Sequence, residues 1–285
     1  AADAVAPLMG NLVMGNLVNR DYEAVLAQAG DTVNVPIPPV MTANNIAEAG
    51  SVTNQNPSPG NAQIALNTHA EATFVIPDVT RAIAVPDLVK LYMQPAMIAL
   101  AERIETDILS QYSLFTANTA VGSAATLTEA VVDNAETKLF DAKVPQAQQR
   151  YLVLSSTAYS QLRQLSRFSE YQILGDPGAS MAAIASGEVM KVKGFGVFRS
   201  QFVQKPSSTT YNLGFTRNAL ALAIRRLPLA LPGTGVVQQY AEIGNFGLRV
   251  TMSYQPNTLA QQFTVDVLYG VGVLRNNHGV QVQSN

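Results

Sequence analysis

The sequence contains no cysteine, and only 13% of its 285 residues are charged. The missing cysteine excludes disulfide bonds, thiolate metal ligands and cysteine nucleophiles, and it leaves the redox compartment open. The charged fraction is about half the ~25% that is usual in globular domains. Because an isolated protein needs a charged surface to stay soluble, few charges among many amides and hydroxyls favour a surface largely covered by partners. A neutral, polar-surfaced enzyme is the alternative that composition leaves open.

The chain also lacks any concentration of positive charge, since its formal net charge is −2 and no stretch gathers Lys and Arg on one face. We therefore expect no sequence recognition of DNA or RNA. The most apolar stretch, residues 219–231, is interrupted by Arg225, Arg226 and Pro228 and predicts no membrane span. No basic residue precedes Arg20, which argues against a signal peptide and predicts a soluble intracellular product.

Residues that carry chemistry are few. The two histidines, His69 and His278, fall in a predicted strand and a terminal loop, without metal-ligand spacing or a serine elbow. The glycine pairs in 194–196 and 233–235 complete no phosphate-binding loop. We predict that the chain is not an enzyme and has no catalytic residue, no metal site and no cofactor.

Apolar and polar residues alternate along fourteen residues, 63–76. The apolar positions are Ile64, Leu66, Ala70, Ala72, Phe74 and Ile76. A strand of this length would reach ~46 Å, whereas a typical strand spans ~17–20 Å. A globule of this chain length has a radius of gyration of ~19 Å. We therefore predict an arm that projects beyond its own core and lies on another copy of the chain.

The segment before this arm predicts the second limb of a hairpin. Residues 31–37 alternate in the same way, and residues 43–62 are rich in Asn, Ser, Pro and Gly, which is typical of a flexible tip. Pro36 and Pro38 cannot donate to a ladder, so this limb should be an edge. Residues 1–30 form an apolar lead with a tandem Met-Gly-Asn-Leu-Val repeat. This segment has two interpretations, an arm that becomes ordered against a neighbouring subunit and a frayed terminus.

Helical periodicity follows the hairpin. Residues 87–112 predict a long helix with Asp87 as N-cap and a kink or an early end at Pro95. Its expected buried face is Leu91, Met97, Ile98, Ala101, Ile104, Ile108 and Tyr112, and its expected solvated flank is Glu102, Arg103, Glu105 and Asp107. Thr126 to Glu129 match an S/T-x-x-E capping box and predict a second helix to Ala142.

Later segments predict strands at 151–154, 248–254 and 262–269, a helix at 157–165 and alternation over 189–203. Strands and helices mix without βαβ repetition, so the fold class is α+β.

The order of these elements, together with several short stretches, resembles the major capsid proteins of tailed bacteriophages, whose fold is named after phage Hong Kong 97. The stretches are Asp31 to Pro36, Ala101 to Asp107, Arg150 to Ser155, Gly194 to Ser200 and Tyr269 to Arg275. These stretches are not invariant signatures, but they occur in the family's order across nearly the whole chain.

The resemblance implies an N-terminal arm (1–30), an extended loop (31–80), a peripheral domain (81–120 and 236–268) and an axial domain (121–235 and 269–285). It implies hexamers and pentamers of this chain, a separate scaffolding protein, a portal and packaged double-stranded DNA that is not read by sequence. Some relatives weld subunits through a lysine in this loop. The first lysine here is Lys90, so we expect a shell held without covalent bonds.

We expect intersubunit contacts in the hairpin, just after it and at the strongest cationic spot of the chain. The residues are Glu48, Asn54, Gln55, Asn56, Ile64, Leu66, Phe74, Arg81, Arg225 and Arg226. For the arginine pair, a neighbour's carboxylate, packaged polyanion and plain solvent are alternative surroundings.

The first functional hypothesis is a virion shell subunit, assembled in the host cytoplasm, that encloses double-stranded DNA. Its slight negative charge suits a wall that does not grip phosphate. The alternatives are an encapsulin nanocompartment around a cargo enzyme, and a neutral hydrolase or binding module that dimerises through a long β-arm.

Overall fold

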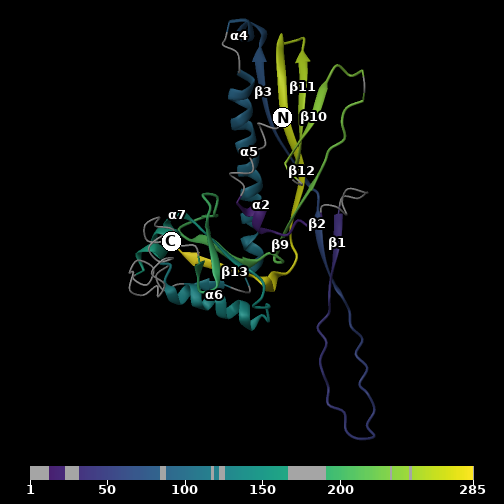
Figure 1. Cartoon of the computed structure of the whole chain (residues 1–285), viewed down its shortest axis with the longest axis vertical. Helices are drawn as coiled ribbons and strands as arrows, with labels where there is room; N and C mark the ends of the chain where they lie inside the picture. Colours follow the sequence, from purple (N-terminus) through teal and green to yellow (C-terminus); the bar gives the residue numbers. More distant parts are fainter. Residues whose placement is uncertain are drawn as a thin grey trace.

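The computed structural model describes residues 13–22, 32–83, 88–116, 119–121, 126–165, 191–231, 233–243 and 246–284. The molecule is elongated (Figure 1). Helix α4 (Asp78–Ile83) lies at one end, the tip of a β-hairpin at the other, and a second α+β body projects to one side.

A long helix and a five-stranded sheet form the upper part of the molecule. The helix is α5 (Leu88–Ser110), continued by the 3-10 turn η1 (Gln111–Phe115). The sheet runs β10 (Val237–Ile243), β11 (Phe246–Gln255), β12 (Ala260–Val273) and β3 (Thr68–Pro77), all antiparallel, and β9 (Leu220–Arg225) pairs with the later half of β12. The fourteen-residue β12 therefore serves two sets of neighbours.

The lateral body is a six-stranded mixed sheet. Its order is β4 (Thr119–Val121), β13 (Gly279–Ser284), β8 (Thr210–Thr216), β5 (Arg150–Leu154), β7 (Phe195–Arg199) and β6 (Lys191–Val192). Helices α6 (Glu129–Asp141) and α7 (Ser156–Gln164) cover one face through an apolar cluster, and the 3-10 turn η4 (Asn276–His278) leads into β13. The fully buried Asn212 fastens this sheet: its amide nitrogen donates to the Val282 carbonyl, and its oxygen accepts from Ser155 N.

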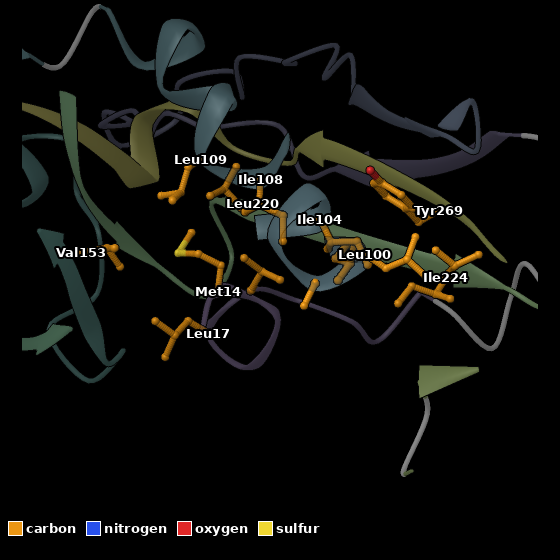
Figure 2. Packing of buried hydrophobic residues seen from close by; sticks show 14 of the residues in the cluster. Met14, Leu17, Leu100, Ile104, Ile108, Leu109, Val153, Leu220, Ile224 and Tyr269 are labelled. Atoms are coloured by element: carbon orange, nitrogen blue, oxygen red, sulfur yellow. The ribbon is translucent and has the colours of Figure 1, made fainter. Parts of the chain in front are cut away.

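A short N-terminal piece fills the junction between the two bodies. Helix α2 (Met14–Leu17) buries Met14 and Leu17 in the cluster that holds α5 to β8 and β9 (Figure 2). After it, Asn19 bridges to β9 through hydrogen bonds with the backbone of Leu220 and Leu222. Residues 1–12, including the first part of the predicted arm repeat, lie outside the described residues.

The hairpin consists of β1 (Thr32–Ile37) and β2 (Gly60–Ala65), paired from Thr32 with Ala65 to Ile37 with Gly60. The predicted edge character of the proline-bearing limb is confirmed, since β1 pairs only with β2 among the described strands. The prediction of one fourteen-residue strand is wrong. The chain breaks after Ala65, and β3 leaves β2 to pair with β12 of the same subunit. The apolar and polar residues alternate through both strands because β2 and β3 each turn one face toward the rest of the subunit.

The helix predictions are confirmed in extent and wrong in some details. Helix α5 ends at Ser110, two residues before the predicted end at Tyr112, and it continues through Pro95. Leu91, expected to be buried, is 65% exposed, and Glu105, expected on the solvated flank, is 1% exposed. The capping box does not form: Thr128 is the N-cap of α6 and makes no side-chain capping bond. Asp87 lies outside the described residues.

Strands β4, β8 and β10 were not predicted from the sequence. The domain boundaries remain a prediction. The five-stranded sheet crosses them, because it takes β3 from the predicted extended loop and β9 from the predicted axial domain, and its strand β12 runs from the predicted peripheral domain into the axial one.

Candidate assembly surfaces

The base of the hairpin is packed onto its own subunit. Ile64 is fully buried in a cluster with Ala221, Ala223 and Leu274. The strand β2 crosses β12 so closely that a Cβ on Gly270 would lie 2.1 Å from the Ala65 carbonyl oxygen. Glycine at this position permits the backbone contact that seats the hairpin. Ile64 thus has no exposed surface with which to touch a neighbour.

The tip of the hairpin has the opposite character. Every residue from Pro38 to Asn61 is exposed. Four large apolar side chains are among them, with exposed fractions of 90% for Val40, 59% for Met41, 56% for Ile46 and 77% for Val52. Glu48 is the one charged residue between Thr32 and Ala65. Exposed apolar side chains gathered on a projecting loop make the tip a candidate contact surface for a partner.

The other end of the molecule is a second exposed apolar surface. No residue of α4 is buried, and Val79, Ile83 and Leu91 are 69%, 81% and 65% exposed. Arg81 donates from Nη1 to Gln261 Oε1 at 2.9 Å, which leaves its charge without a described acidic partner. A six-residue helix that buries nothing gains little stability within its own subunit.

The remaining predicted contact residues lie between these ends. The ring of Phe74 stacks on Phe263 with 5.2 Å between centroids and lies tilted against Tyr92 at 5.7 Å, so much of it has partners within the subunit. Leu66 packs against the cluster at the hairpin base. Arg225 ends β9, and the guanidinium of Arg226 lies 5.9 Å from the Tyr240 ring centroid.

The structure therefore does not gather the predicted residues into one pocket. Glu48, Asn54, Gln55 and Asn56 belong to the hairpin tip, Arg81 belongs to α4 at the opposite end of the molecule, and the arginine pair is found where β9 ends. Contacts spread over opposite ends fit a subunit with several neighbours better than a site for a small ligand.

Some buried ionisable groups were not predicted from the sequence. Their side chains make hydrogen bonds that hold parts of the fold together. Glu105 accepts from Met14 N and Ser200 Oγ, both at 2.9 Å, and burial raises the pKa of this carboxyl. It borders a pocket of about 180 Å³, but its bonds hold the N-terminal segment in place. Burial, with the nearby Arg275, also lowers the pKa of His278.

Two further polar groups join distant elements. Asp266 on β12 accepts from Arg249 Nε at 3.1 Å and lies 2.8 Å from His69 Nε2. The Tyr269 hydroxyl donates to Asp107 on α5 at 2.5 Å, and burial followed by this bond raises the tyrosine pKa. Nothing in the periodicity indicated these pairs, because their members are far apart in the chain.

Within the described ranges, no cluster of three or more His, Asp or Glu side chains has the arrangement of a metal site. No helix of the described part is both long and apolar enough to cross a membrane.

Comparison with solved structures identifies the fold. A chain from Mycobacterium phage Che8 superposes with a TM-score of 0.74 at 19% identity, covering 95% of this chain and 90% of that one. The capsid structure of cyanophage P-SCSP1u gives 0.65 at 15% identity, covering 90% and 84%. The mature capsid of bacteriophage PhiM1 gives 0.62 at 12%, covering 90% and 82%.

No family model and no curated protein matches the sequence itself. The fold is the Hong Kong 97-type capsid fold, of the α+β class, and this confirms the expectation drawn from the resemblance.

Proposed function

We propose that this chain is a major capsid protein that self-assembles into an icosahedral shell around double-stranded phage DNA. The observation that carries the proposal is the hairpin tip, an uninterrupted exposed stretch from Pro38 to Asn61 with apolar side chains that its own subunit does not cover. Copies that cover one another's tips would bury this surface repeatedly. The likeness to capsid structures over 90% or more of the chain supports the same conclusion.

The finer parts of the proposal follow from it. The chain acts as a structural protein of the virion and not as an enzyme, with hexamers and pentamers of itself, a scaffolding protein and a portal as partners, and it assembles in the host cytoplasm. The intersubunit contacts are made by Glu48, Asn54, Asn56, Leu66, Phe74, Arg81, Arg225 and Arg226, and Gln55 belongs to the same tip. The shell is held without covalent bonds, because the hairpin contains no lysine.

Electron microscopy of the expressed chain, with its scaffold where needed, tests the function. Uniform polyhedral particles are expected, and boiling in detergent should release monomers without covalent ladders. A variant with residues 39–58 replaced by a short turn should stay folded, because the hairpin base is retained, and should form no shells. A small discrete oligomer from the intact chain would contradict the proposal.

The encapsulin alternative is separated by the particle contents. Nuclease-protected DNA in particles from the native source supports a virion. A cargo enzyme without nucleic acid would support a nanocompartment, which the capsid structures among the neighbours do not favour.

A further inference from the structure

Few hydrogen bonds hold the hairpin tip in its conformation. All of residues 38–59 are described, and every one is exposed. Their hydrogen bonds are a turn between Gly50 N and the Ala47 carbonyl, at 2.9 Å, and two bonds that join Gln55 to Thr42. The Gln55 bonds are therefore the connection between the two limbs beyond the last ladder pair, Ile37 with Gly60.

The side-chain amide of Gln55 bonds to the backbone of Thr42 as a residue on a neighbouring β-strand would. Thr42 N donates to Gln55 Oε1 at 3.0 Å, and Gln55 Nε2 donates to the Thr42 carbonyl oxygen. A side-chain amide has the donor and acceptor of a peptide group, so this exchange resembles a hydrogen-bonded pair of an antiparallel ladder. Glutamate lacks the donor, and methionine, of similar length, lacks both functions.

The pair divides the tip into parts of different stiffness. Inside it lies the loop 43–54, which contains Glu48 and two of the four exposed apolar side chains of the tip, Ile46 and Val52. Without the pair, this loop would move independently of the two legs. The legs are 38–41 and 56–59, and each contains two prolines: Pro38 and Pro39, and Pro57 and Pro59. Proline restricts the backbone of the legs, so the amide pair closes a loop between two stiff segments.

We infer that Gln55 is a positioning residue for assembly: it sets the shape of the tip before the neighbour is met and acts through Thr42, not through contact with the next subunit. The inference rests on the proposed function. A flexible loop that must order on binding weakens association, and a preformed one avoids much of that loss. The sequence analysis expected Gln55 to contact a neighbouring subunit, whereas here it shapes the tip of its own subunit.

The test compares Gln55→Met with Asn54→Met, a matched change at the adjacent position, which has no hydrogen bond in the tip. Hydrogen exchange on unassembled subunits should be faster at Thr42 in Gln55→Met and unchanged in Asn54→Met. The protein concentration for half-maximal assembly should rise about threefold to tenfold in Gln55→Met. The melting temperature of the unassembled subunit should not change, because both partners are exposed. Thr42→Val should behave as wild type, since the contact uses the Thr42 backbone.

Two results would overturn the inference while wild-type shells still form. Weaker assembly of Gln55→Met with unchanged exchange at Thr42 would mean that Gln55 touches the neighbour directly. Faster exchange with unchanged assembly would mean that the shape of the tip does not matter. Failure of the wild-type chain to form shells would instead contradict the proposed function, and the role of Gln55 with it.

Discussion

The two ends of the hairpin differ in what covers them. At its base, Ile64 is 0% exposed and β2 lies against the backbone of β12, whereas Val52 in the tip is 77% exposed. Both stretches have the same sparse charge and come from one continuous segment. The difference teaches that a projecting element needs a rigid attachment to its own subunit before its free end can serve another. Substitutions in the base should therefore affect folding, and substitutions in the tip should affect assembly.

The largest expected effect is at the base, from Gly270→Ala. The added Cβ would lie 2.1 Å from the Ala65 carbonyl oxygen and 2.8 Å from its carbon, so β2 must lift from β12. We expect a loss of more than ~4 kcal/mol in the free energy of unfolding, measured by urea titration of the unassembled subunit. Gly196→Ala is the control, because its nearest contact would be an ordinary 3.5 Å. Equal behaviour of both variants would mean that the hairpin is not seated on Gly270.

A second pair of variants tests the comparison directly. Ile64→Ala removes a fully buried side chain and should lower the free energy of unfolding by ~2–5 kcal/mol. Val52→Ala should change it by less than ~0.5 kcal/mol but should raise the concentration needed for assembly. Urea titration and light scattering measure the two quantities. The distinction between base and tip fails if Val52→Ala destabilises the isolated subunit as much as Ile64→Ala does.

These residues also show how far the sequence could lead. The hairpin, the spine helix and the α+β class followed from periodicity, because each element buries one face. Ile64 looked like a contact for a neighbour, because alternation shows that a side chain is covered without showing which chain covers it. Strand β8 was missed because six of its seven residues are buried, so both faces are covered and no alternation results.

The assembly surfaces and the groups that support them were also predictable from the sequence only in part. The tip could be read from its composition of proline, glycine and amides. The spacing of Gly270 and Gly272 inside a strand was a usable signal of close backbone approach. The burial of Glu105 could not be read, because its partners Met14 and Ser200 are distant in sequence and only the fold brings them to α5.

The buried Glu105, at the junction between the two bodies, should make the stability of the subunit depend on pH. Burial raises its pKa in the folded chain above the unfolded value. Its favourable contribution is therefore complete below the unfolded pKa and is lost as the pH rises through the folded pKa. Glu105→Gln keeps an acceptor for Met14 N without the buried charge, so it should be more stable than wild type at neutral pH.

Urea titrations between pH 4 and pH 8 measure this difference. The advantage of Glu105→Gln should shrink toward acid, where the wild-type carboxyl is protonated. Glu102→Gln, in the same pocket, is the control. A wild-type advantage at neutral pH would show that the charged form of Glu105 stabilises the N-terminal segment.

The smallest expected effect tests whether the two ends of the molecule meet between copies. Glu48 is the one charge of the hairpin, and Arg81 at the far end binds the neutral Gln261. If the tip of one copy lies on α4 of the next, Glu48→Lys and Arg81→Glu should each weaken assembly, and the double variant should recover it. An exposed ion pair contributes ~0.2–1 kcal/mol, so each single change should raise the assembly concentration by about twofold to fivefold. Light scattering at low salt measures the effect, which high salt should reduce. Additive losses in the double variant would mean that these two charges have different partners, while the division between base and tip would stand.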